Sequence, residues 1–226
     1  MTQIIGITGL AGSGKDSLAD FVLEGYGPSA ARTTFAEPIR RIAARLGLPI
    51  YDRAAKEDAV SLRFEHFEVS LIEAMTEFLE EWVGEETLCD VYATLVTILR
   101  SRGFLTTARQ DVLKISPRRF CQLLGTDAGR AVRQSLWIDV LRAKAAKSRA
   151  DYLLVPDVRF INEANVCDYV VGVERPGLAA VEAHDSEAEI PELVRRSDYA
   201  VLNNGTLDQL QFEAGVLVRL LKEGAL

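Results

Sequence analysis

The sequence has 226 residues, of which 48% are hydrophobic and 26% charged, with a formal net charge of −7. This composition is that of an ordinary globular chain with one domain, or one domain with a large insertion. The acidic balance argues against a non-specific nucleic-acid binder, and no apolar run approaches the roughly twenty residues of a membrane span. The three cysteines are too scattered for a disulfide framework or a zinc site. We therefore expect a cytoplasmic protein.

The first chemically informative stretch is Ile4–Ser17, where apolar residues lead into a glycine-rich turn and a helical pattern follows. The phosphate-binding loop is reproduced by Gly9, four further residues, Gly14 and Lys15. Glycines let backbone N–H groups approach phosphate oxygens, and a helix that begins near Lys15 directs its positive end at the same anion. We predict that the loop binds nucleotide phosphates and that Lys15 bridges the β- and γ-phosphates. The alternative is a turn that binds nothing.

The residue after the lysine departs from the usual pattern. It is normally Ser or Thr, whose hydroxyl binds Mg²⁺, but here it is Asp16, and Ser17 follows. A carboxylate oxygen is also a good Mg²⁺ ligand. Either Asp16 holds the metal, directly or through water, or Ser17 does.

A short extended segment at 32–36 precedes a helix that begins at Glu37-Pro38, since proline suits a first helical turn. Phe35 and Arg40 would then lie at the end of a second parallel strand, on the side where open α/β sheets bind ligands. The alternatives are a core position for Phe35 and a solvated Arg40.

The stretch from about 50 to 110 carries no motif that we can assign. Apolar residues at helical spacing indicate helices within Arg63–Val83 and Leu88–Leu99, and we expect both to lie outside the sheet. The acidic run that includes Glu80 is expected to be a solvated face. Trp82 and the aliphatic residues near it could instead bury against a second subunit.

The stretch from 116 to 150 is predicted to be largely helical. Ser116 and Pro117 have the residue types of an N-cap and a first helical position. We expect Gly125-Thr126 to end this helix and Asp127–Ala150 to continue as the next one. Its arginines and Trp137 suit a nucleoside phosphate, because guanidinium matches phosphate and an aromatic ring stacks on a base. Taken alone, a basic helix surface is the better interpretation.

An apolar strand at Tyr152–Phe160 ends in charged residues, as a buried parallel strand would. Asp157 and Arg159 then emerge at the sheet edge that carries the phosphate loop. An acid there can hold the water shell of Mg²⁺ or accept a proton, and an arginine can clamp a phosphate. The next strand is predicted within Val166–Glu174 and would deliver Arg175.

The last part of the chain is predicted to alternate polar and apolar segments. The polar segment Leu178–Ser197 has the features of a mobile lid, and we interpret its His184 as a surface or capping residue. A strand at Tyr199–Leu202, a turn at Asn203-Asn204-Gly205 and an amphipathic helix at Leu207–Leu221 follow. No internal repeat or low-complexity tract interrupts the chain.

In this order the motifs resemble those of the deoxynucleoside monophosphate kinases of tailed bacteriophages, within the wider group of nucleoside monophosphate and dephospho-coenzyme A kinases. Asp16 supports the match, because Gly-Lys-Asp followed by Ser or Thr is typical of this subgroup. The matching stretches span most of the chain except about 50–110. They are Gly9–Ser17, Thr34–Pro38, Pro117–Arg130, Trp137, Asp157–Glu163, Arg175–Gly177, His184–Glu187 and Asn203–Gly205.

The resemblance implies a P-loop α/β fold with three α/β/α layers, a five-stranded parallel sheet and a helical insertion. It implies a single kinase domain over 1–226, with a largely helical monophosphate-binding region at 35–150, an insertion at about 50–110 and a lid at 176–197. The implied reaction transfers the γ-phosphate of Mg·ATP to a deoxynucleoside 5′-monophosphate. Two alternatives stay open, a dephospho-coenzyme-A-like or phosphomevalonate-like kinase on the same scaffold, and an ATPase switch.

The residues and the resemblance together suggest a role for each candidate side chain. Catalytic roles are expected for Lys15, Arg130, Asp157, Arg159 and Arg175. ATP is expected to contact Ala11, Gly12, Ser13, Gly14, Lys15, Asp16, Ser17, Arg175, Asn204 and Gly205. The deoxynucleotide is expected to contact Phe35, Ala36, Arg40, Arg119, Gln122, Thr126, Arg130, Trp137, Asp157, Arg159 and Glu163. The expected cofactor, Mg²⁺, would be held by Asp16, Ser17 and Asp157.

The expected partners are ATP and a deoxynucleoside monophosphate. Neither nucleic acid nor a membrane is expected, and a homodimer is left open. If the chain is encoded by a phage, as the resemblance implies, it would act in the host cytoplasm.

Overall fold

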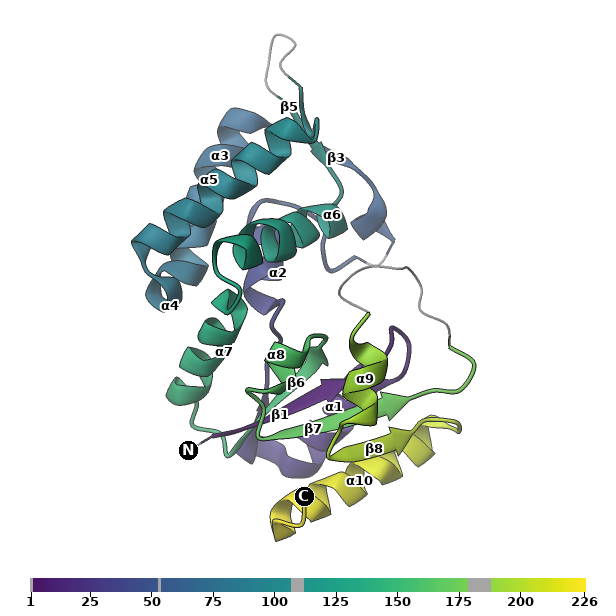
Figure 1. Ribbon diagram of the computed structural model, residues 1–226. Coiled ribbons are helices and arrows are strands. Elements are labelled where there is room, and N and C mark those ends of the chain that lie inside the picture. The colour runs from purple at the N-terminus through teal and green to yellow at the C-terminus, as the bar shows by residue number, and fades with distance from the viewer. Residues whose placement is uncertain (1, 53, 107–111, 179–187) are drawn as a thin grey trace. The chain divides into compact units, whose positions relative to one another are not determined.

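The computed structural model describes residues 2–52, 54–106, 112–178 and 188–226 (Figure 1). Its strands are β1 (Gln3–Thr8), β2 (Ala30–Arg32), β3 (Val60–Arg63), β4 (Leu105–Thr106), β5 (Val112–Ile115), β6 (Tyr152–Val158), β7 (Tyr169–Glu174) and β8 (Tyr199–Leu202). Its α-helices are α1 (Lys15–Tyr26), α2 (Glu37–Arg45), α3 (Phe64–Met75), α4 (Glu81–Val83), α5 (Glu85–Ser101), α6 (Pro117–Gln122), α7 (Leu136–Lys147), α8 (Ile161–Ala164), α9 (Ile190–Arg195) and α10 (Leu207–Glu223). Short 3₁₀ turns, η1 (Gly27–Ser29) and η2 (Ala55–Glu57), and π-helical segments, η3 (Thr76–Glu80) and η4 (Leu123–Arg130), connect them.

The chain divides into two compact units. The sheet unit comprises Met1–Phe35 and Leu141–Leu226, and the helical unit comprises Ala36–Val140. The chain enters the helical unit after β2 and leaves it within α7. Each unit therefore has its own packing, which is described below.

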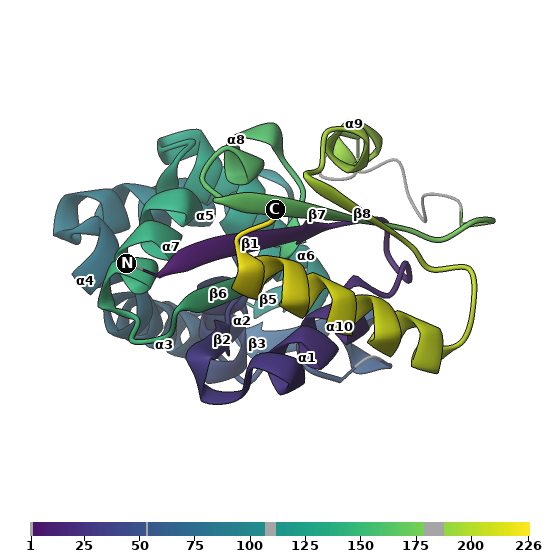
Figure 2. The ribbon, with the colours of Figure 1, turned by 90° about the horizontal axis from the view of Figure 1, so that it is seen from below.

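The sheet unit is built on a five-stranded sheet with the order β2-β6-β1-β7-β8, in which every neighbouring pair is parallel. Its strands are apolar runs because parallel strands are covered on both faces. Figure 2 shows α1 and α10 on one face of this sheet and α8 and α9 on the other. The predicted three-layer fold with a five-stranded parallel sheet is confirmed.

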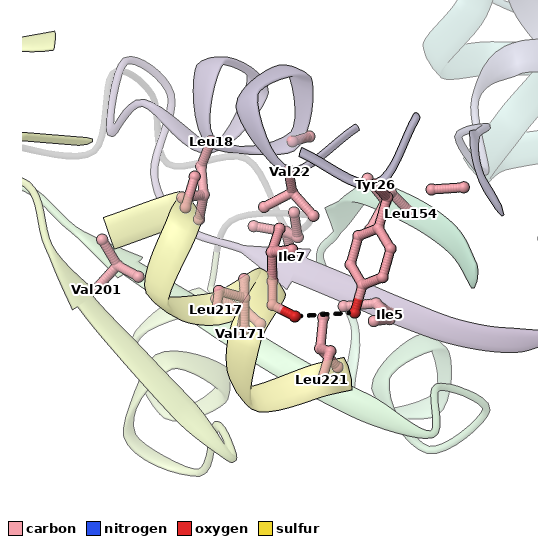
Figure 3. Packing of buried hydrophobic residues seen from close by; sticks show 14 of the residues in the cluster. Ile5, Ile7, Leu18, Val22, Tyr26, Leu154, Val171, Val201, Leu217 and Leu221 are labelled. Atoms are coloured by element: carbon pink, nitrogen blue, oxygen red, sulfur yellow. Dashed lines mark hydrogen bonds between the residues drawn. The ribbon is translucent and has the colours of Figure 1, made fainter. Parts of the chain in front are cut away.

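The main core of the sheet unit lies between the sheet and the pair α1 and α10, which pack against each other (Figure 3). Ile5 and Ile7 of β1 face Leu18 of α1 and Leu217 of α10, and all four are fully buried. The Tyr26 hydroxyl donates a hydrogen bond to the Val218 carbonyl oxygen at 3.2 Å, which satisfies the polar end of a ring buried in this layer. This core fixes β1 and α1, the two elements that border the glycine-rich loop.

The predicted strand positions need small corrections. The extended segment expected at 32–36 is strand only at Ala30–Arg32, so Phe35 and Ala36 lie beyond its end. Strand β6 ends at Val158 and β7 begins at Tyr169, whereas β8 has the predicted bounds. The exact end of a strand is set by its last hydrogen bond to the neighbouring strand. Proline and charged residues in the sequence show only roughly where that bond lies.

Part of the range predicted as a lid is helix α9. Its Ile190 and Leu193 are buried, and the helix packs against β7 of the same unit. The polar composition of this range concealed the helix, because only two of its residues face the core. His184 and the rest of 179–187 lie outside the described residues, and the lid at 176–197 stays a prediction.

The helical unit contains the helices predicted within Arg63–Val83 and Leu88–Leu99. The first is α3 continued by η3 and α4, and the second is the central part of α5. A small antiparallel sheet with the order β3-β5-β4 was not predicted. Its strands are only two to four residues long, and β3 is far in the sequence from β4 and β5, so none of them carries a clear local signal of its own.

Ser116 is the N-cap of α6, as predicted, and accepts a hydrogen bond from the Arg119 backbone N–H. The prediction that Gly125-Thr126 ends this helix is wrong, because the chain continues as the π-helix η4. Gly125 is instead a packing position, since a Cβ added there would lie 2.9 Å from Ile39 Cδ1. The helix expected over Asp127–Ala150 is interrupted before α7 and ends at Lys147.

The three cysteines differ in their surroundings, and this leads to a prediction. Cys89 on α5 is exposed, whereas burial raises the pKa of Cys121 and of Cys167 to about 12. The thiolate is the reactive form, so at pH 8 we expect a maleimide to label Cys89 about 10²-fold faster than the other two. Mass spectrometry of peptides over time measures the three rates. The Cys89→Ser variant should lose the fast phase, and a fast phase that survives would contradict this assignment.

Candidate active site

The phosphate-binding loop lies where it was predicted, between the end of β1 at Thr8 and the start of α1 at Lys15. Gly9, Gly12 and Gly14 all have positive φ, at 154°, 81° and 98°. A Cβ added at Gly9 would lie 2.5 Å from the Val173 carbonyl oxygen, on the neighbouring strand. The turn therefore depends on glycine both for its backbone angles and for its close approach to β7.

Lys15 is the first residue of α1, and its Nζ donates to the Leu10 carbonyl oxygen at 3.3 Å. The ammonium group is thereby held over the loop rather than extended into solvent. Ser13, within the loop, is buried, and its hydroxyl has no hydrogen-bond partner among the described residues. The backbone N–H groups at the start of α1 add a positive dipole end. The loop thus has a fixed cation, helix N–H groups and a hydroxyl that suit an anionic phosphate.

Two other strands of the sheet unit contribute to this loop. The Asn203 side chain, just after β8, donates its Nδ2 hydrogen to the Ser13 carbonyl oxygen at 2.8 Å. Arg175, just after β7, lies with one guanidinium nitrogen 3.5 Å from the Gly12 carbonyl oxygen. The carboxyl ends of β1, β7 and β8 therefore meet at the loop, as expected for the ligand edge of a parallel sheet.

A pocket of about 400 Å³ adjoins the end of β8 and the first turns of α10. It includes Asn204 and Gly205, which were predicted to contact ATP, and the largely exposed side chains of Leu202 and Phe212. The hydrogen bond from Asn203 joins this pocket to the loop. Its lining is formed by Leu202, Asn203, Asn204, Gly205, Asp208, Gln209, Leu210, Phe212 and Glu213. Apolar walls with a few amide and carboxylate groups suit a nucleoside base.

Asp157 and Arg159 lie at the end of β6, next to β1 in the sheet. Asp157 Oδ1 accepts a hydrogen bond from the Phe35 backbone N–H at 2.9 Å, and Phe35 itself is buried. The carboxylate thus fixes the chain directly after β2.

Glu163 has a different placement from the one its predicted role requires. Its side chain is 3% exposed, and Oε2 accepts hydrogen bonds from the backbone N–H groups of Arg159 and Phe160 at 2.8 and 3.2 Å. The carboxylate therefore caps α8 and shapes the turn that carries Arg159. We assign it to positioning rather than to contact with a substrate.

Asp16 forms an ion pair that the sequence did not suggest. Its Oδ1 lies 2.5 Å from one terminal nitrogen of Arg32, at the end of β2, and the other terminal nitrogen pairs with Asp20. Ser17 follows on the same turn of α1 and is half-buried. Arg32 could have been found by the rule that selected Asp157, since both residues lie near the carboxyl ends of parallel strands.

The oxygen donors near the loop fit Mg²⁺. This ion prefers oxygen ligands and usually takes only one or two carboxylates from the protein, with phosphates and water completing its shell. Asp16 and Asp157 supply carboxylate oxygens, and Ser17 supplies a hydroxyl. The chemistry of this donor set agrees with the predicted metal ligands, whose role stays a prediction.

The predicted residues in the helical unit lie on α2, α6 and η4, which pack together. Arg119 donates from its guanidinium to Gln122 Oε1 at 3.3 Å, and the positive charge of Arg40 acts on Cys121, so these groups are neighbours within the unit. Thr126 and Arg130 are half-buried in η4, and Ala36 is the N-cap position of α2. This unit therefore gathers basic and amide groups on one set of helices.

Trp137 does not have the exposed ring that base stacking requires. It is 3% exposed, its Nε1 donates to the Gly125 carbonyl oxygen at 2.8 Å, and a Cβ added at Gly129 would lie 2.7 Å from its ring. The ring is thus packed over glycines of η4. We correct its predicted role from stacking on a base to fixing η4, which carries Thr126 and Arg130.

No helix within the described ranges is both long and apolar enough to cross a membrane.

Two features of the sheet unit define the class of P-loop nucleotide-binding proteins. A glycine loop that ends in a lysine lies between the central strand of a parallel sheet and the following helix. Charged residues lie at the carboxyl ends of the neighbouring strands. A family model described as deoxynucleotide monophosphate kinase matches residues 3–213. The chain belongs to this family of enzymes. The family, the kinase activity and the fold class predicted from the sequence are confirmed.

Individual relatives agree with this result. The chain is 28% identical over 181 residues to a deoxynucleoside-5′-monophosphate kinase of Escherichia phage T5, covering 74% of this chain and 72% of that protein. It is 26% identical over 233 residues to a deoxynucleotide monophosphate kinase of Enterobacteria phage T4, covering 92% and 95%. It is also 22% identical to a putative deoxynucleotide monophosphate kinase of Acanthamoeba polyphaga mimivirus, covering 91% of each chain.

Proposed function

We propose that this chain transfers the γ-phosphate of ATP, bound with Mg²⁺, to a deoxynucleoside 5′-monophosphate and releases ADP and the deoxynucleoside diphosphate. The observation that carries this proposal is the glycine loop with Lys15 held over it, in a chain of the deoxynucleotide monophosphate kinase family. Among the predicted site residues, arginine and lysine outnumber the carboxylates that could act as general bases, as expected when the acceptor is a phosphate group. Phosphoryl transfer requires charge neutralisation and positioning more than acid–base chemistry.

The donor nucleotide is proposed to place its β- and γ-phosphates in the loop. Ala11, Gly12, Ser13 and Gly14 would offer backbone N–H groups, and Lys15 would offer its ammonium. The pocket that includes Asn204 and Gly205 adjoins the loop through Asn203, and this supports its assignment to the donor nucleoside.

The metal is proposed to be held by Asp16, Ser17 and Asp157. When bound, Mg²⁺ would neutralise charge on the β- and γ-phosphate oxygens and orient them. The residues of the chain hold the triphosphate in line with the acceptor, which makes the transfer effectively intramolecular.

The side chains proposed to contact the acceptor are assigned for each unit by itself. In the sheet unit these are Phe35, Asp157 and Arg159, and in the helical unit Ala36, Arg40, Arg119, Gln122, Thr126 and Arg130. An oxygen of the acceptor phosphate attacks the γ-phosphorus, the bond to the β-phosphate oxygen breaks, and ADP leaves. The charge that spreads over the transferred group would be stabilised by Lys15, Arg130, Arg159 and Arg175.

We further propose that the enzyme acts in the host cytoplasm if it is phage-encoded.

The test is a set of reactions in which Mg·ATP is offered with dAMP, dGMP, dCMP, dTMP or 5-hydroxymethyl-dUMP, one at a time. A reaction without acceptor and one with a coenzyme A precursor serve as controls, and chromatography identifies both ADP and the phosphorylated product. We expect at least one deoxynucleotide to give its diphosphate in amounts equal to ADP. ADP release that no acceptor stimulates would favour an ATPase switch, and product from the precursor alone would overturn the substrate class.

A further inference from the structure

Arg32, which the proposed reaction does not use, links β2 to the first turns of α1. One terminal nitrogen of its guanidinium lies 2.5 Å from Asp16 Oδ1, and the other pairs with Asp20. The Arg32 side chain is 27% exposed, whereas those of Asp16 and Asp20 are 67% and 56% exposed. The arginine is thus the most firmly enclosed member of this group of three.

The two carboxylates need such a partner. Asp16 and Asp20 are four residues apart on α1, so they lie on the same face of the helix and repel each other. Without a partner, an exposed carboxylate rotates freely. Arginine can hold two carboxylates at once because its fork presents several N–H donors in one plane.

The position of Arg32 is itself fixed by the sheet. Arg32 pairs with Leu154 in the parallel ladder between β2 and β6, so its backbone has a defined place at the carboxyl end of β2. The orientation of Asp16 therefore depends on β2 as well as on the loop. Both terminal nitrogens of Arg32 are engaged by carboxylates, which argues against a direct role on phosphate.

We propose that Arg32 is a positioning residue for the metal: it holds Asp16 through Oδ1 and so leaves Oδ2 oriented toward Mg²⁺ or a water of its shell. This inference rests on the proposed function, in which Asp16 is a metal ligand. Residues that orient a metal ligand act on metal affinity without touching the metal. Arg32 is accordingly expected to affect the contribution of Mg²⁺ to nucleotide binding and not the binding of the phosphates themselves.

The test compares nucleotide affinity with and without the metal. Isothermal titration calorimetry with a non-hydrolysable ATP analogue, in Mg²⁺ and in EDTA, gives two dissociation constants, and their ratio is the magnesium gain. We expect Arg32→Gln to lower this gain by about 10-fold or more, the range that loss of a ligand-orienting partner gives. The affinity in EDTA should change by less than about twofold.

A double-variant comparison tests whether Arg32 acts through Asp16. Asp16→Asn should lower the magnesium gain at least as much as Arg32→Gln does, and the double variant should lose no more than Asp16→Asn alone. Arg32→Lys should recover only part of the gain, because an ammonium group cannot replace the fork. Arg45→Gln, which removes another arginine that pairs with two carboxylates, here those of Glu73 and Glu77 in the helical unit, is the matched control and should leave the gain unchanged. Thermal unfolding of each variant identifies one that fails to fold.

Four results would overturn the proposal. The first is a magnesium gain in Arg32→Gln that is unchanged or larger, and the second is a loss of nucleotide affinity in EDTA as large as the loss in Mg²⁺. The third is a double variant whose loss of magnesium gain is the sum of the losses of the two single variants. The fourth is a wild-type protein without any magnesium gain. The last result removes the metal role of Asp16 while phosphoryl transfer, measured separately, still decides the proposed function. Failure of the inference and failure of the function are thus distinguishable.

Discussion

The Lys15→Met variant is expected to lose phosphoryl transfer by about 10³-fold or more while it keeps its fold, since removal of even one neutral donor to a developing charge costs about 10²- to 10³-fold. The lysine ammonium lies over the glycine loop and is the only cation that the phosphate-loop motif itself contains. Methionine has a similar length and keeps the apolar stem, so the loop should retain its shape. The turnover number with Mg·ATP and the preferred deoxynucleotide measures the loss.

The matched control for this variant is Lys114→Met, which removes an exposed lysine of β5 in the helical unit. It should have wild-type turnover. Thermal unfolding should show that both variants keep the fold, with a free energy of unfolding within about 0.5 kcal/mol of the wild-type value, the usual effect of a surface substitution. Near-wild-type turnover of Lys15→Met would exclude the loop as the donor site.

The Gly9→Ala variant is expected to lower kcat/KM by about 10²-fold, the effect of a misplacement of about 1 Å at a reacting group. The added methyl group would meet the Val173 carbonyl oxygen at 2.5 Å and Ser13 Oγ at 2.6 Å. Backbone at β7 cannot move aside without disturbing the sheet, so the loop must shift. We also expect the free energy of unfolding to fall by about 1–3 kcal/mol, as for other strained backbone positions. Steady-state kinetics and denaturant titration measure the two effects.

Gly27→Ala separates close approach from backbone strain. Gly27 has φ of 62°, but nothing lies within 4 Å of an added Cβ. This variant should lose about 1 kcal/mol of stability and keep its activity, because only the backbone angle is disfavoured. Equal kinetic losses in Gly9→Ala and Gly27→Ala would show that contact with Val173 is not what shapes the loop.

Much of the sheet unit could be predicted from local signals. The loop glycines need positive φ, Lys15 has its place in a known spacing, and buried parallel strands are apolar along their whole length. Each of these properties depends on only a few neighbouring residues, so it can be predicted without knowledge of the rest of the chain. Misplaced strand ends, such as that of β2, reflect hydrogen bonds to another strand.

The wrong predictions concern residues whose type suits two different structural roles. Gly125 has the residue type of a helix end, yet it is a packing position inside a continuous helical segment. Trp137 has the residue type of a base-stacking platform, yet its ring and its N–H are used inside the protein. Residue type permits both roles in each case, and the choice depends on what lies across from the side chain.

The amino-acid sequence alone was sufficient for the class of fold, the place of the glycine loop and the family of enzyme, because these follow from short-range spacing, glycine conformation and the order of motifs. Three-dimensional packing was needed to learn that Arg32 pairs with Asp16, that Asn203 ties β8 to the loop, and that Glu163 caps α8. In the first two, residues 16 and 190 positions apart meet because parallel strands end at a common edge. In the third, burial of a carboxylate is acceptable only because two backbone N–H groups satisfy it. The first two contacts arise from the assembled sheet, whereas the third lies within five residues, and it was missed because the sequence does not show that Glu163 is buried.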